Sequence, residues 1–255
     1  MPPDLPRSFD LTGRVAVVTG ASSGLGDGFA RSLAAGGATV VAAARRAGRL
    51  ASLAADVPGL VPVECDVTVA ADRARLVAVA SEINGGIDVL VNNAGRAGPP
   101  DALTETAEEF DAILGVNLSA GFHLSVAAVA GLPEGRGASI VNISSVVGLV
   151  STAPIGGAGY AASKAAVIGM TRELAGQWGR RGVRVNAIVP GWFDTEMTDG
   201  LFANEKSAGW VRRGTMLGRG GRDGEVDGAL LFLASDASSY VTGHVLTVDG
   251  GWTAR

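Results

Sequence analysis

The sequence is poor in the residues from which disulfides, thiolate metal clusters and histidine-based sites are built. Its 255 residues include one cysteine, Cys65, and two histidines, His123 and His244. A single cysteine excludes an intrachain disulfide and a zinc site made of several thiolates, and it suits a reducing compartment, so we expect a cytoplasmic protein. Neither histidine has cysteine or carboxylate partners nearby in the sequence. This argues against a hydrolase triad and predicts no metal site.

Charge and long apolar runs are also scarce. Charged residues make up 18% of the chain and the formal net charge is -4, which does not fit the concentrated basic surface that nucleic acid binding requires. The longest apolar stretch, residues 120–133, is interrupted by His123 and is too short to cross a bilayer. Residues 1–10 lack the pattern of a secretory signal and are expected to form a loose arm. The expected partner is a small molecule, with no nucleic acid and no membrane.

Short runs of valine and isoleucine recur along the chain and alternate with helix-length segments rich in alanine and leucine. The runs are nearly continuous in apolar character, as expected for parallel strands buried on both faces. Six are located, at residues 14–19, 38–44, 87–92, 139–144, 183–189 and 244–249. Helices are expected at residues 25–35, 69–83, 105–130, 158–178 and 225–234. This alternation predicts a single α/β domain over residues 1–255, a Rossmann-type doubly wound parallel sheet of about seven strands.

Two long irregular segments interrupt this alternation, at residues 147–159 and from residue 191 onward. Both follow strands, so they are expected at the carboxyl edge of the sheet, where α/β sheets bind ligands. Residues 191–217 are expected to form a substrate lid. Its large apolar side chains either line a pocket for an apolar substrate or pack against the domain or another subunit; they are Trp192, Phe193, Met197, Leu201, Phe202 and Trp210.

Three glycines follow the first expected strand, in the sequence TGASSGLG at residues 19–26. Glycines in this position let the backbone turn tightly and approach a pyrophosphate, which then faces the free N–H groups at the start of the next helix. A glycine pattern by itself can be a simple turn, but its place between strand and helix favours a dinucleotide site.

The end of the second expected strand carries arginines in place of the acid that would bind the ribose hydroxyls of NAD. Ala44 occupies that position, and Arg45 and Arg46 follow. We expect Arg45 to meet a 2′-phosphate, which favours NADP(H) without excluding NAD(H). Arg46 and Arg49 are interpreted at least as readily as the solvated start of a helix.

Tyr160 and Lys164 stand four positions apart in the sequence YAASK. On a helix this spacing places both side chains on one face, where the ammonium can favour ionisation of the phenol. The alternative is a packing pair on an amphipathic helix. The glycine loop and Ser145 favour the catalytic interpretation.

Several short motifs together resemble the short-chain dehydrogenase/reductase family over nearly the whole chain. They are TGASSGLG, CDV at 65–67, NNAG at 92–95, VNLS with Asn117, NISSVVG with Ser145, YAASK, PGWFDT at 190–195 and VTGHVLTVDGG. The resemblance, strongest to 3-oxoacyl-(acyl-carrier-protein) reductases, implies an oxidoreductase and a homo-oligomer, a tetramer or dimer that pairs residues 105–130 and 158–178. It implies the catalytic residues Asn117, Ser145, Tyr160 and Lys164. With the glycine loop and Arg45, the cofactor-binding positions are Gly20, Ser22, Ser23, Gly24, Leu25, Gly26, Arg45, Asp66, Val67, Asn93, Ala94, Gly95, Tyr160, Lys164, Pro190, Gly191, Phe193 and Thr195.

The family's roles carry over position by position. Asp66 and Val67 resemble the adenine site, residues 93–95 line the adenosine ribose, and the Phe193 backbone and Thr195 hold the nicotinamide carboxamide. The bland alternatives are that NNAG stabilises the end of its strand and that Thr195 caps the next helix. Asn117 either satisfies local backbone groups or holds a water that links Lys164 to solvent, and both can hold at once.

In this chemistry Tyr160 is the acid or base, Lys164 lowers the pKa of Tyr160, and Ser145 holds the substrate oxygen, while Ser144 supports the backbone. The interval between Ser145 and Tyr160 is slightly longer than the family's commonest spacing. We predict hydride transfer between NADP(H) and the carbonyl or secondary alcohol of a neutral, fairly apolar substrate. A 3-oxoacyl-thioester reductase is the alternative, weakly indicated by Arg136 and Arg181 as contacts for an acidic carrier; a dinucleotide-binding sensor or scaffold is the non-enzymatic one.

Overall fold

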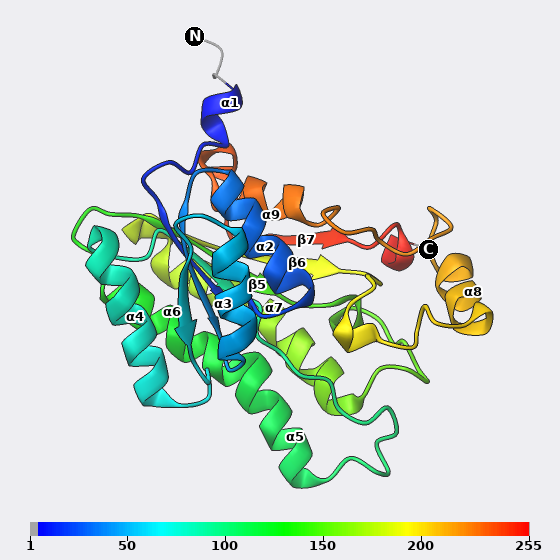
Figure 1. Cartoon of the computed structure of the whole chain (residues 1–255). Helices are drawn as coiled ribbons and strands as arrows, with labels where there is room; N and C mark the ends of the chain where they lie inside the picture. Colours follow the sequence, from blue (N-terminus) through cyan, green and yellow to red (C-terminus); the bar gives the residue numbers. More distant parts are fainter. Residues whose placement is uncertain (1–4, 255) are drawn as a thin grey trace.

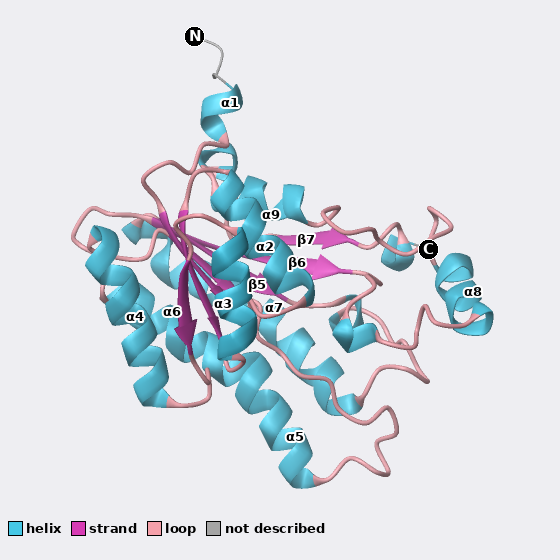
Figure 2. Cartoon of the chain, viewed as in Figure 1, coloured by secondary structure: helices cyan, strands magenta, loops and turns pink. Residues whose placement is uncertain are grey.

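A central sheet of seven parallel strands organises the structure, a computed structural model that describes residues 5–254 (Figures 1 and 2). The strands are β1 (Val15–Thr19), β2 (Thr39–Ala44), β3 (Val61–Glu64), β4 (Val89–Asn92), β5 (Ala138–Ile143), β6 (Val183–Pro190) and β7 (Val245–Val248), in the spatial order β3-β2-β1-β4-β5-β6-β7. This order confirms the doubly wound α/β fold. The strand order reverses between β1 and β4, so a ligand crevice is expected outside the carboxyl ends of these two strands.

Helices cover both faces of the sheet. They are α1 (Leu5–Ser8), α2 (Gly24–Ala35), α3 (Ala47–Asp56), α4 (Ala70–Asn84), α5 (Ala107–Leu114), α6 (Ala120–Ala130), α7 (Ala158–Trp178), α8 (Glu205–Gly214) and α9 (Asp227–Ala234). Helices α2, α3 and α9 pack on one face, and α4, α6 and α7 pack on the other. Helix α8 lies at the rim, beyond the ends toward which the arrowheads of β6 and β7 point (Figure 2).

Side chains along β1 show why the strands are apolar throughout. Ala16 and Val18 pack into the cluster under α2, α3 and α9, whereas Val15 and Val17 pack into the cluster under α4, α6 and α7. Successive side chains of a strand point to opposite faces, so a strand covered by helices on both faces has no solvent-facing position. All five residues of β1 are buried.

The elements at the edge and rim differ most from expectation. The edge strand β3 was not located in the sequence, because only Val63 of its four residues is buried. Helix α3 was anticipated only in the alternative that made Arg46 and Arg49 the solvated start of a helix, and its extent was not predicted. Within the expected lid, Glu205–Gly214 forms helix α8 where an irregular segment was predicted. Residues 5–8 of the expected arm form one helical turn, and residues 1–4 lie outside the described residues.

The helix predicted at residues 105–130 begins at Ala107, capped by Thr106 and Glu109, and contains a π-helical turn at Gly115–Ser119. By length and composition, the continuous helix Ala107–Ala130 is long and apolar enough to cross a membrane, which the shorter run at residues 120–133 did not suggest. Its buried side chains pack against the sheet: Leu124 and Val129 belong to the core shared with α4 and α7. Phe122 and Val126 remain 40% exposed on the outer face, and the predicted homo-oligomer remains a prediction.

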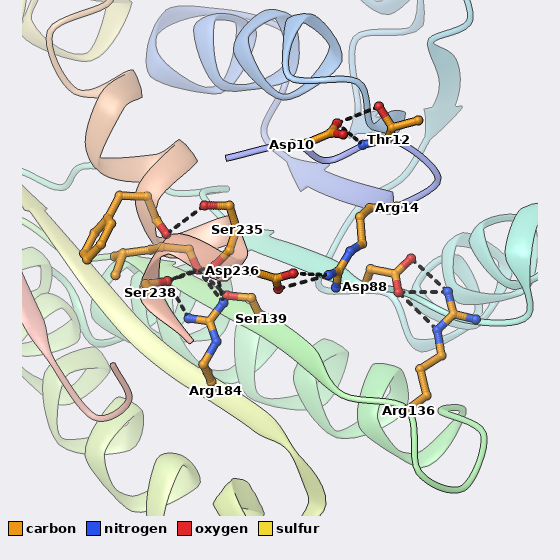
Figure 3. A network of polar contacts seen from close by, with 12 residues as sticks. Asp10, Thr12, Arg14, Asp88, Arg136, Ser139, Arg184, Ser235, Asp236 and Ser238 are labelled. Atoms are coloured by element: carbon orange, nitrogen blue, oxygen red, sulfur yellow. Dashed lines mark hydrogen bonds and ion pairs between the residues drawn. The ribbon is translucent and has the colours of Figure 1, made fainter. Parts of the chain in front are cut away.

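The amino edge of the sheet, opposite the ligand edge, carries a network of arginine contacts (Figure 3). Arg136 forms a bidentate pair with the buried carboxylate of Asp88, which also accepts a hydrogen bond of 2.8 Å from the Val15 N–H. Arg181 donates to the Val129 carbonyl at 3.2 Å. Each arginine lies two residues before the start of a strand, β5 or β6, so both lie at the edge remote from the ligand crevice. They do not offer a carrier contact beside it.

Candidate active site

A cleft of about 1400 Å³ opens at the carboxyl edge of the sheet, beside the neighbouring strands β1 and β4 between which the strand order reverses. It is larger than the roughly 300–1,000 Å³ of an ordinary small-molecule pocket, so it has room for an extended ligand and a second molecule beside it. Every predicted catalytic and cofactor-binding residue lines it except Asn117, which lies behind its wall.

The glycine loop forms one end of this cleft. Gly20 and Gly24 have φ values of +68° and +53°, which only glycine adopts readily. Ser23 is the N-cap residue of α2 but makes no side-chain capping bond, because its hydroxyl accepts a hydrogen bond from Arg46 at 2.5 Å. The first N–H groups of α2 are therefore left for a ligand, and the negative charge of a pyrophosphate suits a helix N-terminus.

Cys65, Asp66 and Val67 and the arginines after β2 line the part of the cleft where the family resemblance predicts adenosine. Asp66 accepts hydrogen bonds from the N–H and hydroxyl of Thr68, which lower its pKa, and the charge of Arg45 lowers it further. Burial raises the pKa of the Cys65 thiol to about 11. This cysteine is therefore a small buried side chain and not a nucleophile at neutral pH.

Asn93 joins the ends of β4 and β1. Its side-chain amide donates to the Thr19 carbonyl at 2.9 Å and its backbone N–H donates to the Thr19 hydroxyl at 3.0 Å. These bonds support the structural interpretation of NNAG, while Ala94 and Gly95 also face the cleft. Gly95 is close to the catalytic groups: a side chain there would come within 3.6 Å of the Lys164 ammonium.

Ser145 and Ser144, which follow β5, have different roles. The Ser144 hydroxyl donates to the Lys164 carbonyl at 2.7 Å, which fixes β5 against α7 and fits the backbone-supporting role expected for it. Ser145 faces the cleft, and its hydroxyl accepts the Val147 N–H at 3.3 Å. The same hydroxyl contacts Tyr160 closely enough to lower the pKa of the phenol.

Tyr160 and Lys164 lie on one face of α7, as predicted. The Lys164 nitrogen is 5.6 Å from the centre of the Tyr160 ring and donates to the Ile143 carbonyl at 2.8 Å. Burial raises the pKa of Tyr160, the hydrogen bond with Ser145 lowers it, and Lys164 does not contribute. The expected lowering by Lys164 is therefore not seen in this structure. Burial lowers the pKa of Lys164 itself to about 8.

Three comparisons with known proteins agree with this geometry. A family model described as "Enoyl-(Acyl carrier protein) reductase" matches residues 20–253. The chain is 42% identical to the 3-oxoacyl-(acyl-carrier-protein) reductase of Thermotoga maritima over 94% of this chain and 98% of the relative. It is 40% identical to the gluconate 5-dehydrogenase of Gluconobacter oxydans, covering 97% of this chain and 98% of the relative. The chain belongs to the short-chain dehydrogenase/reductase family.

Solved structures of short-chain dehydrogenases/reductases superimpose on nearly the whole chain. A protein of this type from Mycobacterium marinum has a TM-score of 0.92 at 34% identity and covers 97% of this chain and 98% of its own. A gluconate 5-dehydrogenase from Burkholderia cenocepacia, solved with NADP and tartrate, has a TM-score of 0.92 at 33% identity and covers 98% and 99%. The protein is thus an oxidoreductase of CH–OH or carbonyl groups.

Asn117 lies in the π-helical turn between α5 and α6, a feature frequent at functional sites. Its side chain accepts from the Arg96 N–H at 2.8 Å and donates to the Arg96 carbonyl at 3.0 Å and to the Ser163 hydroxyl at 2.9 Å. These bonds satisfy the buried amide and fix the loop after β4 against α7. The proton-relay role that family resemblance implies for Asn117 remains a prediction.

Residues after β6 both form local hydrogen bonds and line the cleft. The Thr195 N–H and hydroxyl bond to the Thr198 hydroxyl, which also donates to the Phe193 carbonyl at 2.6 Å, so the capping alternative for Thr195 is seen directly. Pro190, Gly191, Phe193 and Thr195 nevertheless line the cleft.

The large apolar side chains of the expected lid do not separate cleanly into cleft and core. Trp192 and Leu201 line the cleft and also pack with Phe202, Trp210 and Trp252 in a small core, whereas Met197 lines the cleft and is 49% exposed. Met197 stands closest to the chemistry, with its sulfur 3.7 Å from the Tyr160 hydroxyl.

Arg46, interpreted from the sequence at least as readily as the solvated start of a helix, makes several contacts inside the cleft. Its guanidinium donates to the hydroxyls of Ser22 and Ser23 in the glycine loop and pairs with Glu196. Arg45 also lines the cleft but makes no side-chain hydrogen bond among residues 5–254. The absence of an acid at Ala44 predicted an arginine site here. Which of the two arginines bonds to the glycine loop depends on the residue at which α3 begins.

Proposed function

We propose that the protein interconverts a carbonyl and a secondary alcohol with NADP(H) as the hydride carrier. This proposal rests on a cleft lined by Ser145, Tyr160 and Lys164. The glycine loop lines the same cleft, and the helix α2 that follows the loop has no side-chain cap at its N-terminus. The cleft fits a dinucleotide: the loop has glycines where side chains would clash, and the start of α2 has free N–H groups. When bound, the nicotinamide supplies or accepts the hydride.

The residues of the chain move and hold the proton. Tyr160, whose pKa is raised by burial, is protonated at neutral pH and can donate its proton to the oxygen of a carbonyl substrate. Ser145 can donate a hydrogen bond to the same oxygen and so fix it beside the phenol. Lys164 places a positive charge next to the phenol and stabilises the tyrosinate left after proton transfer.

A preference for NADP(H) is supported by two cleft arginines and by the absence of a carboxylate at residue 44. A 2′-phosphate is recognised by arginine, whereas the 2′-hydroxyl of NAD is recognised by an acid in this position. A gluconate 5-dehydrogenase with which this chain shares its fold was solved with NADP.

The walls beside Tyr160 favour a neutral, fairly apolar substrate. Apolar side chains line the cleft that holds Tyr160, and one of them, Met197, has its sulfur 3.7 Å from the phenol oxygen; the set is Val147, Ile155, Trp192, Met197 and Leu201. Burying apolar substrate surface against such walls stabilises the complex in proportion to the area removed from water.

A second substrate class is favoured by Arg96, which follows the NNAG motif and lines the cleft. Its guanidinium has no ion pair or hydrogen bond among the described residues, and its backbone is fixed by Asn117 beside the catalytic groups. An unpaired arginine there suits a hydroxy or oxo acid, and relatives are named gluconate 5-dehydrogenases. A 3-oxoacyl thioester is the third class, supported by the name of another relative.

A substrate panel tests these classes. Simple ketones, oxo acids and acetoacetyl thioesters are reduced in parallel with NADPH and with NADH, following cofactor absorbance. Tyr160→Phe should lower turnover about 10²- to 10⁴-fold, the usual size of general acid catalysis, with dinucleotide binding retained. Binding without turnover of any substrate class in the wild type would favour the sensor alternative. A preference for NADH would contradict the role given to the arginines.

A further inference from the structure

A carboxylate reaches across the mouth of the cleft to an arginine on the opposite side. Glu196, directly after Thr195, accepts a hydrogen bond from Arg46 at 2.9 Å, and its second oxygen lies 3.4 Å from Arg49. Arg46 is the N-cap residue of α3, and Glu196 begins a short 3₁₀ turn in the segment after β6, so 150 residues of sequence separate the two. We call Arg46 and Glu196 the mouth pair.

The same arginine is held by the glycine loop. Its Nε donates to the Ser22 hydroxyl at 3.0 Å and one terminal nitrogen donates to the Ser23 hydroxyl at 2.5 Å. The loop and the segment after β6 also approach each other directly, because a side chain at Gly24 would come within 3.3 Å of Thr195. The mouth pair therefore joins three segments that line the cleft.

Glu196 occupies the place that an anion would take. Two hydroxyls and a guanidinium form a donor set that suits a phosphate, and in this structure a carboxylate completes it. Hydrogen bonds with Ser23 and Arg46 lower the pKa of Glu196, so the carboxylate is ionised at neutral pH. A phosphate that binds Arg46 must therefore displace the carboxylate and then tolerate it nearby.

We infer that Glu196 sets the discrimination between NADP(H) and NAD(H) by competing with the 2′-phosphate for Arg46. The inference rests on the proposed use of NADP(H). NADPH must exchange the carboxylate for its 2′-phosphate, whereas NADH has no group that makes this exchange. The mouth pair thus weakens binding of the phosphorylated dinucleotide selectively.

The effect is expected to be modest because the pair is exposed. The side chains of Arg46 and Glu196 are 46% and 49% exposed, and exposed ion pairs change an equilibrium by up to about fivefold. Glu196→Gln keeps the size of the side chain and removes its charge. We expect it to lower the Kd for NADPH about two- to fivefold and to change the Kd for NADH less than about 1.5-fold.

The experiment measures both dissociation constants by calorimetry for wild type and Glu196→Gln at low and high salt. Asp236→Asn is the matched control: it removes the same charge from an exposed pair with Arg14 at the amino edge of the sheet, away from the cleft. The control should leave both constants unchanged. The difference between wild type and Glu196→Gln should shrink at high salt, where exposed charges are screened.

The double variant Arg46→Met/Glu196→Gln tests whether Glu196 acts through Arg46. If Glu196 acts through Arg46, adding Glu196→Gln to Arg46→Met should leave the Kd for NADPH unchanged. An equal change for both dinucleotides, weaker NADPH binding in Glu196→Gln, or a persistent gain in the Arg46→Met background would each overturn the inference while leaving the proposed function intact. Wild-type protein that binds neither dinucleotide would overturn the proposed function and this inference together.

Discussion

Lys164 is a cation that the fold removes almost completely from water. Its side chain is 4% exposed, donates to the Ile143 carbonyl and has no carboxylate partner among residues 5–254. Desolvation disfavours the charged form and lowers its pKa from 10.5 to about 8. Between pH 8 and pH 10.5 the unfolded chain holds this proton and the folded chain does not. The contribution of Lys164 to stability therefore rises with pH across that range.

This shift can be read directly, because the chain contains two lysines, Lys164 and Lys206. In protein labelled with ¹³C-lysine, the Cε signal of Lys164 should titrate with a midpoint near pH 8. Lys206 is exposed on α8 and gives the reference signal. Lys206→Arg removes that signal and so shows which of the two signals belongs to Lys164. A Lys164 midpoint at the ordinary value of 10.5 would show that water or an anion reaches the ammonium in solution.

The single residues show what sequence could and could not supply. Tyr160 and Lys164 were predicted from their helical spacing, and Ser145 from its place after a strand together with the family pattern. Arg45 was favoured for the 2′-phosphate, which stays a prediction. That Arg46 bonds to the glycine loop could not be foreseen, since a one-residue change in where α3 starts turns a different side chain toward that loop. The pairing of Arg46 with Glu196 depends on two segments far apart in the chain, and no local pattern reveals it.

Two of the three glycines of helix α2, Gly26 and Gly28, have opposite requirements, which makes the glycine loop testable as an element. A side chain at Gly26 would lie 2.5 Å from the Asn93 amide nitrogen and closer still to the Gly20 carbonyl oxygen. Such overpacking typically costs about 1–3 kcal/mol of stability. We expect Gly26→Ala to lower the melting temperature and to weaken dinucleotide binding at least about tenfold, since the loop must shift away from β4.

Gly28→Ala is the matched control for that change. A side chain at Gly28 would meet only the Asp227 carboxylate at 3.7 Å, which is an ordinary contact. Alanine is preferred over glycine within a helix by about 0.5–1 kcal/mol, so this variant should melt at a higher temperature and bind dinucleotide normally. Equal effects of the two substitutions would show that helix propensity, and not the packing of α2 against β4, decides the outcome.

The accuracy of the element predictions follows burial. Strands β1, β2, β4, β5 and β6 were located because both faces of the sheet are covered and the strands are apolar. Strand β7 lies at the other edge and its residues are only half-buried, but its sequence VLTV remains rich in strand-forming apolar residues. Strand β3 lies at the edge, and its sequence VPVE contains a proline and an exposed glutamate, so it lacks that signal. Helix α8 has few apolar residues, and its burial depends on Gly209, Val211 and Gly214, which no helical periodicity singles out.

The two edges of the sheet divide function from stability across the whole molecule. The carboxyl edge holds the cleft, the glycine loop and the proposed catalytic residues. The amino edge holds the arginine network of Figure 3, in which Arg136 pairs with buried Asp88 and Arg14 pairs with exposed Asp236. Because the strands separate the two edges, changes at the amino edge are expected to alter unfolding and leave ligand binding in the folded protein unaffected.

The last prediction compares two arginines of this network. Arg136→Met leaves the Asp88 carboxylate, whose side chain is 6% exposed, without its cation, so it should lower the free energy of unfolding by about 3–5 kcal/mol. Arg14→Met removes a pair whose side chains are 36% and 65% exposed and should cost less than about 1 kcal/mol. Urea unfolding at one protein concentration measures both, and dinucleotide binding to the folded variants should match wild type. Equal losses of stability would mean that burial of Asp88 does not decide the strength of its pair, and weakened binding in Arg136→Met would show that the amino edge communicates with the cleft.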